Sequence, residues 1–306
     1  MKKDLISIKD LSQDEIKHIF DLTDRLKTDP KAIGMPLVGK SMAMIFQKPS
    51  NRTRVSFEVG MIQLGGHAIY LGPDTIKLGE REKTSDIAKT LARYLDIIVA
   101  RVFAHQDVID LAKHSTIPVI NGLSDLSHPC QALADAYTIK EKAGKFQGVK
   151  LAFVGDGNNV VSSLLYTAGK IGLDFSIATP KGYEPDKEIF KQALGFAKKT
   201  GAKITLSNDP EEAVKDADFI YTDVWASMGQ EKEALKRKKV FKGFSVDSSL
   251  VSFAKKNCMI MHCLPAHRGE EITDQVIDSK NSIVFDEAEN RLHVQKAILV
   301  WLLVEK

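Results

Sequence analysis

Short apolar segments with the pattern of buried strands alternate with amphipathic helical segments along almost the whole chain of 306 residues. Residues 41–46, 97–101 and 149–154 are examples of the strand-like runs. Parallel sheets with helices on both faces produce this alternation, because each parallel connection has to cross over the sheet. The pattern therefore predicts an α/β fold built on parallel sheets.

The alternation forms two series separated by the loop 143–148, which predicts two doubly wound domains joined by helices. The chain length agrees with two domains of roughly 150 residues each. The last predicted helix, residues 288–304, is apolar on much of its circumference, so we expect it to pack back against the first domain. The expected strands are 41–46, 67–71, 97–101 and 118–121 in the first series, and 149–154, 175–179, 203–206, 219–222 and 259–263 in the second.

The composition favours a cytosolic protein with a small-molecule partner. Lys and Arg total 43 against 40 for Asp and Glu, and this net charge of +3 gives no global argument for nucleic acid. The longest apolar run, 297–304, is far short of the ~20 residues of a membrane span, and the N-terminal residues contain no apolar signal segment. The 3 cysteines form no C-x-x-C pair, which predicts reduced thiols. We interpret the basic cluster 236–239 as a solvated helix face.

The junction 48–57 carries arginines and hydroxyl residues between an apolar strand and an amphipathic helix that we expect over residues 55–64. Ser50 and Thr53 are suited to cap the helix, and Arg52 and Arg54 supply charged donors beside its first N–H groups. An anion, and phosphate above all, fits such a junction. An N-capped surface turn with solvated arginines has the same pattern, so other segments have to decide.

Polar residues follow several of the other predicted strands. Ligands bind outside the carboxyl ends of the strands in an open parallel sheet, so these residues are expected to line a site. Each alone also has an ordinary structural explanation, such as an exposed strand end or a buried cysteine. Their recurrence favours a site. The first domain offers Arg101, His128 and Gln131, and the second offers residues 156–159, Asp223, 227–229 and 262–265.

A dinucleotide site and a metal site are alternatives for two of these segments. Gly155 and Gly157 follow a strand, but Val160 stands at the third glycine position and no acidic residue ends the next strand. Adjacent strand residues such as His262 and Cys263 point to opposite faces, so we do not expect them to share a metal ion. The pattern therefore disfavours both NAD and a metal.

Five motifs together resemble the aspartate/ornithine carbamoyltransferase family, in the family's order and over essentially the whole chain. The first two are shared by the aspartate and ornithine enzymes, so they imply carbamoyl phosphate as a substrate. The third and fourth imply ornithine as the acceptor. The motifs are Ser-Asn-Arg-Thr-Arg at 50–54, His-Pro-Cys-Gln at 128–131, Asp-Val-Trp-Ala-Ser-Met-Gly at 223–229, Met-His-Cys-Leu-Pro-Ala-His-Arg-Gly at 261–269 and Phe-Asp-Glu-Ala-Glu-Asn-Arg at 285–291.

The resemblance implies one substrate for each domain. Residues 1–142, with the C-terminal helix 288–306 packed back on them, are expected to bind carbamoyl phosphate, and residues 143–287 to bind ornithine. The family usually has Gln or His at the position of Lys77, and the resemblance implies that this position reaches a neighbouring subunit's site. The implied carbamoyl phosphate contacts are Ser50, Asn51, Arg52, Thr53, Lys77, Arg101, His128, Gln131, Cys263, Leu264 and Arg291. The implied ornithine contacts are Asn159, Asp223, Ser227 and Met228.

The implied reaction transfers a carbamoyl group to the δ-amine of L-ornithine through a tetrahedral intermediate, in a site between the two domains, with no cofactor or metal. Thr53, Arg101 and His128 are expected to stabilise the oxyanion. Cys263 is expected to orient the amine, with a covalent role as the alternative. The resemblance also implies a cytoplasmic homotrimer, or an assembly of trimers, that acts in arginine metabolism without nucleic-acid or membrane partners.

Three other functions stay open at this point. A carbamoyltransferase for a different amine, such as putrescine, would keep the motifs of the first domain and need no carboxylate site. An NAD-dependent dehydrogenase would bind a nicotinamide cofactor. A non-catalytic anion-binding module would bind carbamoyl phosphate and turn nothing over.

Overall fold

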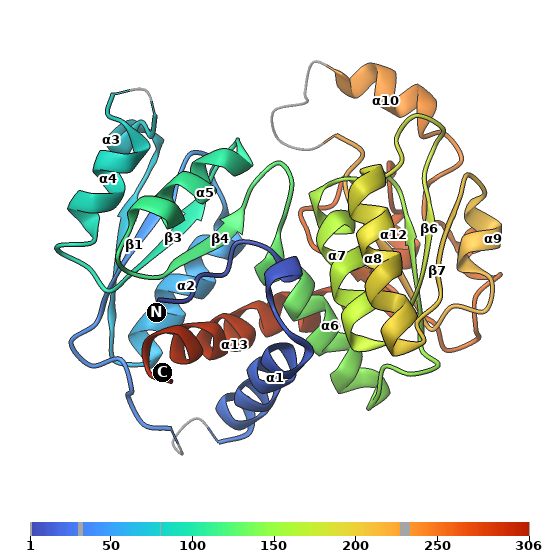
Figure 1. Cartoon of the computed structure of the whole chain (residues 1–306). Coiled ribbons are helices and arrows are strands. Elements are labelled where there is room, and N and C mark those ends of the chain that lie inside the picture. The colour runs from blue at the N-terminus through green and yellow to red at the C-terminus, as the bar shows by residue number, and fades with distance from the viewer. Residues whose placement is uncertain (1, 30–32, 80, 227–232, 306) are drawn as a thin grey trace. The chain divides into compact units, whose positions relative to one another are not determined.

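The chain divides into two compact units, which Figure 1 shows in a computed structural model that describes residues 2–29, 33–79, 81–226 and 233–305. Unit 1 contains Met1–Ala134 and Glu289–Lys306, and unit 2 contains Asp135–Ala288. The sequence pattern predicts the boundary in or just after the helix 129–142. The division of the structure falls within helix α6 (Pro129–Ala143), and helix α13 (Val284–Leu303) also contributes residues to both units.

Unit 1 is built on a four-stranded parallel sheet in the order β2-β1-β3-β4. Helices on both faces bury the strands β1 and β3 along almost their whole length, as expected for a parallel sheet. The chain runs from β1 to β2 on one side and returns to β3 on the other, so the strand order reverses between β1 and β3. The strands are β1 (Ser41–Phe46), β2 (His67–Leu71), β3 (Ile97–Arg101) and β4 (Val119–Leu123).

The helices of unit 1 connect these strands and complete its core. Helix α4 packs against α5, and Ile87, Leu111, Ile45 and Ile98 meet in the core between these helices and the sheet. Helix α1 begins with a capping box in which Ser12 and Glu15 satisfy each other's backbone N–H groups. The helical elements are η1 (Ile8–Asp10), α1 (Gln13–Thr28), α2 (Asn51–Gln63), α3 (Pro73–Ile76), α4 (Thr84–Leu91) and α5 (His105–His114).

Unit 2 is built on a five-stranded parallel sheet in the order β7-β6-β5-β8-β9. Its order reverses between β5 and β8, so this sheet also has a switch point where a ligand can bind beyond the carboxyl ends of two strands. The strands are β5 (Lys150–Val154), β6 (Asp174–Ala178), β7 (Ile204–Ser207), β8 (Phe219–Thr222) and β9 (Met259–His262).

The helices α7 and α8 of unit 2 lie side by side (Figure 1). The chain then reverses direction across the sheet, and the right-handed crossover rule places α9 on the opposite face, where it contacts β5, β6 and β7. Ala152, Ile220, Phe241 and Ile260 belong to one buried cluster of this unit. The helices are α7 (Asn159–Ile171), α8 (Lys187–Thr200), α9 (Pro210–Val214), α10 (Ala234–Val240), α11 (Ser248–Val251) and α12 (Asp274–Ile277).

The structure confirms the predicted parallel α/β fold but moves two helix starts. Helix α2 begins at Asn51, so residues 51–54 form its first turn rather than a loop before it. Helix α13 begins at Val284 rather than at residue 288, because Val284 is already packed into the core of unit 2. The second shift places Glu287 on a helix, which matters for the site described below.

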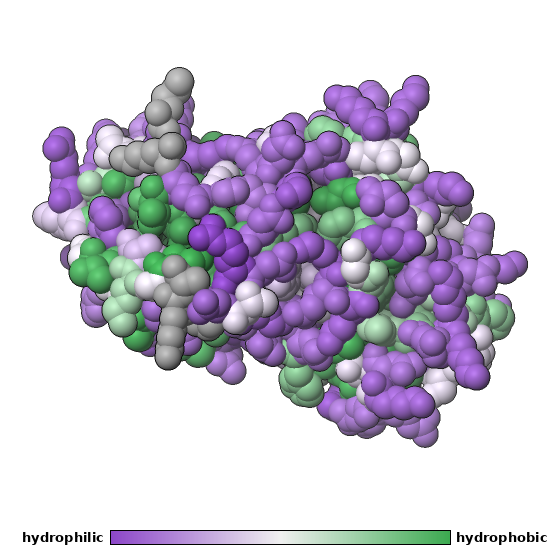
Figure 2. Space-filling view, turned by 90° about the horizontal axis from the view of Figure 1, so that it is seen from below, coloured by the Kyte–Doolittle hydropathy of each residue, from purple (hydrophilic) through white to green (hydrophobic). Residues whose placement is uncertain are grey.

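The described part of the chain contains no helix long and apolar enough to cross a membrane. Hydrophilic residues cover most of the molecular face in Figure 2, and apolar residues gather there in smaller patches.

Candidate active site

The junction between β1 and α2 forms a capped helix N-terminus. Ser50 has extended backbone angles, and its hydroxyl accepts a hydrogen bond of 3.2 Å from the Thr53 N–H group. This cap satisfies one of the first N–H groups and orients the whole first turn. Asn51 is exposed and Arg52 is half-buried on that turn. The geometry therefore presents donors at the positive end of the helix dipole, where anions bind.

Arg291 joins this turn to the start of α6 within unit 1. Its guanidinium group donates to the Thr53 hydroxyl over 3.2 Å and also to the Gln131 side-chain oxygen. All three side chains are almost fully buried. Arg291 comes from α13, so the C-terminal helix supplies a positive charge to a cluster that is otherwise built from the first half of the chain.

His128 and Arg101 are buried beside the same cluster. Burial lowers the pKa of His128 well below its ordinary value, and the positive charges of Arg291, Arg101 and Arg52 act in the same direction. The imidazole is therefore neutral at physiological pH and can donate one N–H group to a carbonyl oxygen. Guanidinium groups around a neutral imidazole suit a phosphate group with a polarised carbonyl beside it.

Lys77 does not join this cluster. It is exposed at the C-terminal end of α3, in the left-handed region with φ 39°. Within the described part of the chain, no hydrogen bond or ion pair connects its side chain to the other predicted residues of unit 1.

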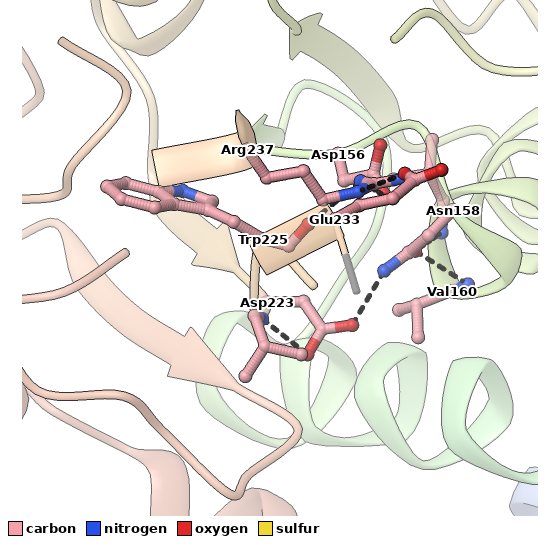
Figure 3. A network of polar contacts seen from close by, with 9 residues as sticks. Asp156, Asn158, Val160, Asp223, Trp225, Glu233 and Arg237 are labelled. Carbon is pink, nitrogen blue, oxygen red and sulfur yellow. Dashed lines mark hydrogen bonds and ion pairs between the residues drawn. The ribbon is translucent and has the colours of Figure 1, made fainter. Parts of the chain in front are cut away.

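Asp223, directly after β8, is the centre of the polar set in unit 2. One of its carboxylate oxygens accepts a hydrogen bond of 2.8 Å from the Asn158 side chain, as Figure 3 shows. The other accepts from the Val224 N–H group over 2.8 Å and from the Cys263 thiol over 3.0 Å. A carboxylate has about four acceptor positions, so Asp223 can take a further donor such as an ammonium group.

Asn158 is held by the helix that it caps. Its side-chain oxygen accepts from the N–H groups of Val160 and Val161, at 2.9 and 3.3 Å, which leaves its NH₂ group to hold Asp223. Asn159 is the half-buried first residue of α7. The predicted ornithine contacts Ser227 and Met228 lie outside the described residues.

Cys263 and Leu264 follow β9 immediately and bring the end of this strand to Asp223. Burial raises the pKa of Cys263 well above its ordinary value, and the Asp223 carboxylate adds to the shift. The group is therefore a neutral thiol that donates to Asp223, whereas a nucleophile would require the thiolate. Leu264 has φ 55°, which is unusual for a branched residue and is typical of strained functional loops.

The structure corrects our geometric argument about the metal alternative. Because Cys263 lies just beyond the end of the strand, ligand atoms of Asp223, His262 and Cys263 lie within 4.8 Å of one another. Both ring nitrogens of His262 are nevertheless hydrogen-bonded within the protein. Its Nδ1 atom accepts from the Leu264 N–H group over 2.8 Å, and its Nε2 atom donates to Glu271 over 3.1 Å. Neither ring nitrogen then has a lone pair to offer a metal ion.

Another part of the same chain packs against the glycine-rich segment after β5. The Gly157 N–H group donates to the Tyr183 carbonyl over 2.9 Å, and a Cβ atom at Gly157 would lie only 2.4 Å from the Pro185 nitrogen. This glycine therefore allows two backbone segments to approach closely. The close approach gives the Gly-x-Gly pattern a structural cause that needs no dinucleotide.

Sequence reasoning missed two buried ionisable residues near Asp223. The interpretation of residues 236–239 as a solvated face is wrong for Arg237, which is 6% exposed and pairs with Asp156 over 2.9 Å (Figure 3). Only the spacing of Glu233 and Arg237, one helical turn apart, hinted at a specific role. The partner of Arg237 lies 81 positions earlier and no local pattern reveals it.

Glu287 is the second missed residue and is completely buried. Its carboxyl oxygens accept from the His262 N–H group over 3.0 Å and from the Tyr221 hydroxyl over 3.3 Å. Burial raises the pKa of Glu287 well above its ordinary value, and the nearby Asp135 carboxyl acts in the same direction. A neutral Glu287 thus supports the strand end that carries Cys263. Glu287 lies within the motif at 285–291, but the sequence analysis assigned a role only to Arg291 of that motif.

The fold and the two polar sets define a two-domain α/β transferase, with an arginine-rich anion site in one unit and a carboxylate prepared for a cation in the other. The family model described as the aspartate/ornithine carbamoyltransferase carbamoyl-P binding domain matches residues 3–141. The model described as the Asp/Orn binding domain of the same enzymes matches residues 147–302. The chain belongs to the aspartate/ornithine carbamoyltransferase family.

Within this family, the chain is similar to several ornithine carbamoyltransferases. The ornithine carbamoyltransferase of Pyrococcus horikoshii is 58% identical over 304 residues, which are 98% of this chain and 96% of that protein. The protein of Pyrococcus furiosus that is named anabolic ornithine carbamoyltransferase is 56% identical with the same coverage. A solved structure of the Pyrococcus furiosus enzyme matches with a TM-score of 0.97, 55% identity and coverage of 100% of this chain and 98% of that one. The Thermus thermophilus enzyme matches with a TM-score of 0.90, 44% identity and coverage of 99% of both chains.

Proposed function

We propose that the protein transfers the carbamoyl group of carbamoyl phosphate to the δ-amine of L-ornithine, giving L-citrulline and phosphate. The observation that carries this function is the identity of 58% and 56%, over nearly the whole chain, to two proteins named ornithine carbamoyltransferase. The residues that such a reaction requires are present at the switch points of both sheets. The expectation from the sequence motifs is thereby confirmed for the reaction, and the roles of single residues follow here as proposals.

The arginine-rich cluster of unit 1 is suited to bind carbamoyl phosphate. Ser50, Asn51, Arg52 and Thr53 hold the phosphate group at the N-terminus of α2, where the helix dipole favours the charge that grows as phosphate leaves. Arg291 contributes a further positive charge and, by donating to the Thr53 hydroxyl, orients it. We propose that Lys77 acts in an assembly, because it is exposed on the single chain and no hydrogen bond or ion pair among the described residues connects its side chain to the cluster.

The carbamoyl end of that substrate is placed against Arg101, His128 and Gln131. Attack on the carbonyl carbon shifts negative charge to its oxygen, and Thr53, Arg101 and a neutral His128 can donate to that oxygen. Removal of one such donor typically costs ~100-fold or more in rate. The low pKa of His128 supports a role as a hydrogen-bond donor rather than as a cation.

The carboxylate of Asp223 is suited to hold the α-ammonium group of ornithine. Asn158, Val224 and Cys263 fix its two oxygens and still allow a further donor. Asn159, Ser227 and Met228 complete the proposed amino-acid contacts. A free amine has a pKa near ~10, so the reacting δ-amine has to lose a proton before it attacks.

Cys263 orients this amine as a neutral thiol, with Leu264 beside it. The raised pKa of the thiol supports this role over a covalent one, because the carbamoyl donor is already activated and a thiolate is not available. The leaving phosphate is the acceptor for the proton of the amine.

We also propose a cytoplasmic homotrimer, or an assembly of trimers, that acts in the synthetic direction of arginine metabolism. The family resemblance supports the assembly, and the name of the anabolic Pyrococcus furiosus relative supports the direction. Helix α2 also offers a surface for self-association: Val55 and Ile62 are 50% and 61% exposed. They line a pocket of about 590 Å³ together with Ser50 and Tyr70. Light scattering at several protein concentrations measures the assembly.

The test of the proposed function is an initial-rate assay of citrulline and phosphate formation from carbamoyl phosphate. Ornithine, putrescine, aspartate and N-acetylornithine are offered in parallel. We expect turnover with ornithine and no other acceptor. Turnover with putrescine would remove the need for Asp223 as a ligand of an α-amino acid, and no turnover with any acceptor would leave only an anion-binding module.

A further inference from the structure

Arg237 makes more specific contacts than any solvated lysine of its own helix. Its Nη1 atom donates to the Asp156 carboxylate over 2.9 Å and to the Trp225 carbonyl over 2.8 Å, and its Nε atom donates to Glu233 over 3.3 Å. The guanidinium group also lies 5.0 Å from the centre of the Tyr183 ring. Figure 3 shows Arg237 aligned with Asp156, with Glu233 and Trp225 beside it. This arrangement uses the fixed planar donors of arginine, which lysine does not have.

The contacts of Arg237 connect two chain segments that both lead to Asp223. Asp156 belongs to the turn after β5, and this turn continues to Asn158, which donates to the Asp223 carboxylate over 2.8 Å. Trp225 follows Asp223 by two residues after the end of β8. Arg237 therefore fixes the chain on both sides of the carboxylate on which the proposed binding of ornithine depends.

Charge gives a second reason for a buried arginine at this position. Burial raises the pKa of the Asp156 carboxyl to about 6, and the charges of Asp223 and Glu233 also favour its protonated form, whereas Arg237 opposes them. Without Arg237, the ionised forms of Asp156 and Asp223 would repel each other in a region that excludes water. Arg237 thus supplies a positive charge that offsets part of this repulsion.

We propose that Arg237, paired with Asp156, is a positioning residue that sets the location of the Asp223 carboxylate for the acceptor amino acid. The inference rests on the proposed function and assigns no contact between Arg237 and substrate. The inference predicts different effects on the binding of the two substrates. The residues proposed to bind carbamoyl phosphate lie in unit 1, except for Cys263 and Leu264 after β9. Loss of Arg237 then weakens ornithine binding and leaves carbamoyl phosphate binding unchanged.

The first test compares Arg237→Gln with Lys236→Gln, which removes the same charge from an exposed position of the same helix. We expect Arg237→Gln to raise the KM for ornithine at least about tenfold, with a smaller change in kcat, because its effect is on ground-state positioning. The Kd for a non-hydrolysable phosphonate analogue of carbamoyl phosphate, measured by calorimetry, is expected to stay within about twofold of the wild-type value. Lys236→Gln is expected to match wild type in all three quantities.

Two more variants keep the test decisive where Arg237→Gln does not fold. Asp156→Asn combined with Arg237→Gln removes both buried charges at nearly constant shape, so neither charge of the pair is left buried without its partner. Arg237→Lys keeps the charge and loses the planar fork. We expect the KM of the double variant for ornithine to lie between the wild-type value and the raised value of Arg237→Gln. We also expect Arg237→Lys to raise this KM by less than Arg237→Gln does.

The outcomes separate this inference from the proposed function. A wild-type ornithine KM in a folded Arg237→Gln or double variant, with normal citrulline formation, would overturn the positioning role and leave the function intact. Equal losses of ornithine and phosphonate binding would also overturn it, since they would indicate general destabilisation. Absence of citrulline formation by the wild-type protein would instead refute the function itself.

Discussion

Asn158 performs two tasks that substitution can separate. Its side-chain oxygen caps α7 through Val160 and Val161, and its NH₂ group holds Asp223 over 2.8 Å. Asn158→Ala removes both interactions. Loss of an N-cap costs about 1 kcal/mol of stability, which corresponds to a decrease of roughly 2–4 °C in the unfolding temperature of a domain of this size.

The second loss concerns Asp223. A hydrogen bond to a charged group contributes about 1.5–3 kcal/mol, and its absence frees the carboxylate to rotate away from the orientation that receives ornithine. If all of that energy is expressed in binding, the KM for ornithine rises by roughly 10- to 150-fold. The assay is an initial-rate measurement with ornithine varied at saturating carbamoyl phosphate, accompanied by thermal unfolding of the same preparations.

Asn158→Ser is the matched control. Serine caps helices nearly as well as asparagine, but it is too short to replace the amide donor at Asp223. We expect this variant to unfold close to the wild-type temperature while its KM for ornithine rises as in Asn158→Ala. An ornithine KM that follows the unfolding temperature in both variants would refute the reasoning, because the hydrogen bond to Asp223 would then have no effect of its own.

Four other predictions concern single residues of unit 2. Gly157→Ala forces a Cβ atom against the Pro185 backbone at 2.4 Å and is expected to lower the unfolding temperature. Gly195→Ala, in the interior of α8 with no atom within 4 Å of the new Cβ, is expected to raise stability by about 0.5–1 kcal/mol. A stabilised Gly157→Ala variant or a destabilised Gly195→Ala variant would contradict the corresponding prediction. The neutral thiol of Cys263 should react with iodoacetamide near neutral pH at least about tenfold more slowly in the native protein than in the urea-unfolded chain. Peptide mass spectrometry can follow both reactions, and a native rate equal to or above that of the unfolded chain would contradict the raised pKa of this thiol. Burial raises the pKa of Asp156 from 3.8 to about 6, so the stability that its proton contributes is complete below pH 3.8 and is lost as the pH rises through about 6. Urea unfolding is expected to show that the stability of wild type relative to Asp156→Asn falls by roughly 2 kcal/mol between about pH 4 and pH 7, and a constant difference would exclude the shift.

Most of the fold could be predicted from the sequence, because the strands of a parallel sheet are local apolar runs with clear ends. The run 41–46, for example, is the strand β1 to the residue. The start of α13 was harder to place, because residues 282–285 are apolar enough to resemble a strand. Their helical conformation depends on the packing of Val284 into unit 2, and no local pattern carries that information.

The candidate site could be predicted where a residue's role depends on its place at a strand end. Asp223 and Cys263 follow neighbouring strands, and the structure brings them to 3.0 Å of each other. The role of Arg237 could not be predicted in this way, because its burial depends on Asp156 and on the Trp225 carbonyl, which are distant in sequence. In the sequence it resembles the exposed lysines on either side.

The place of Arg291 in unit 1 has a consequence for biosynthesis. Its contacts with Thr53 span 238 positions of the chain, and unit 1 is completed only by the last eighteen residues, Glu289–Lys306. A ribosome that has made the first half of the protein has therefore released the strands of unit 1 without the helix that supplies Arg291 to the cluster at α2. Unit 2 is contiguous and can fold before unit 1 is complete, so the nascent chain has to keep its first domain from aggregating until its last residues emerge.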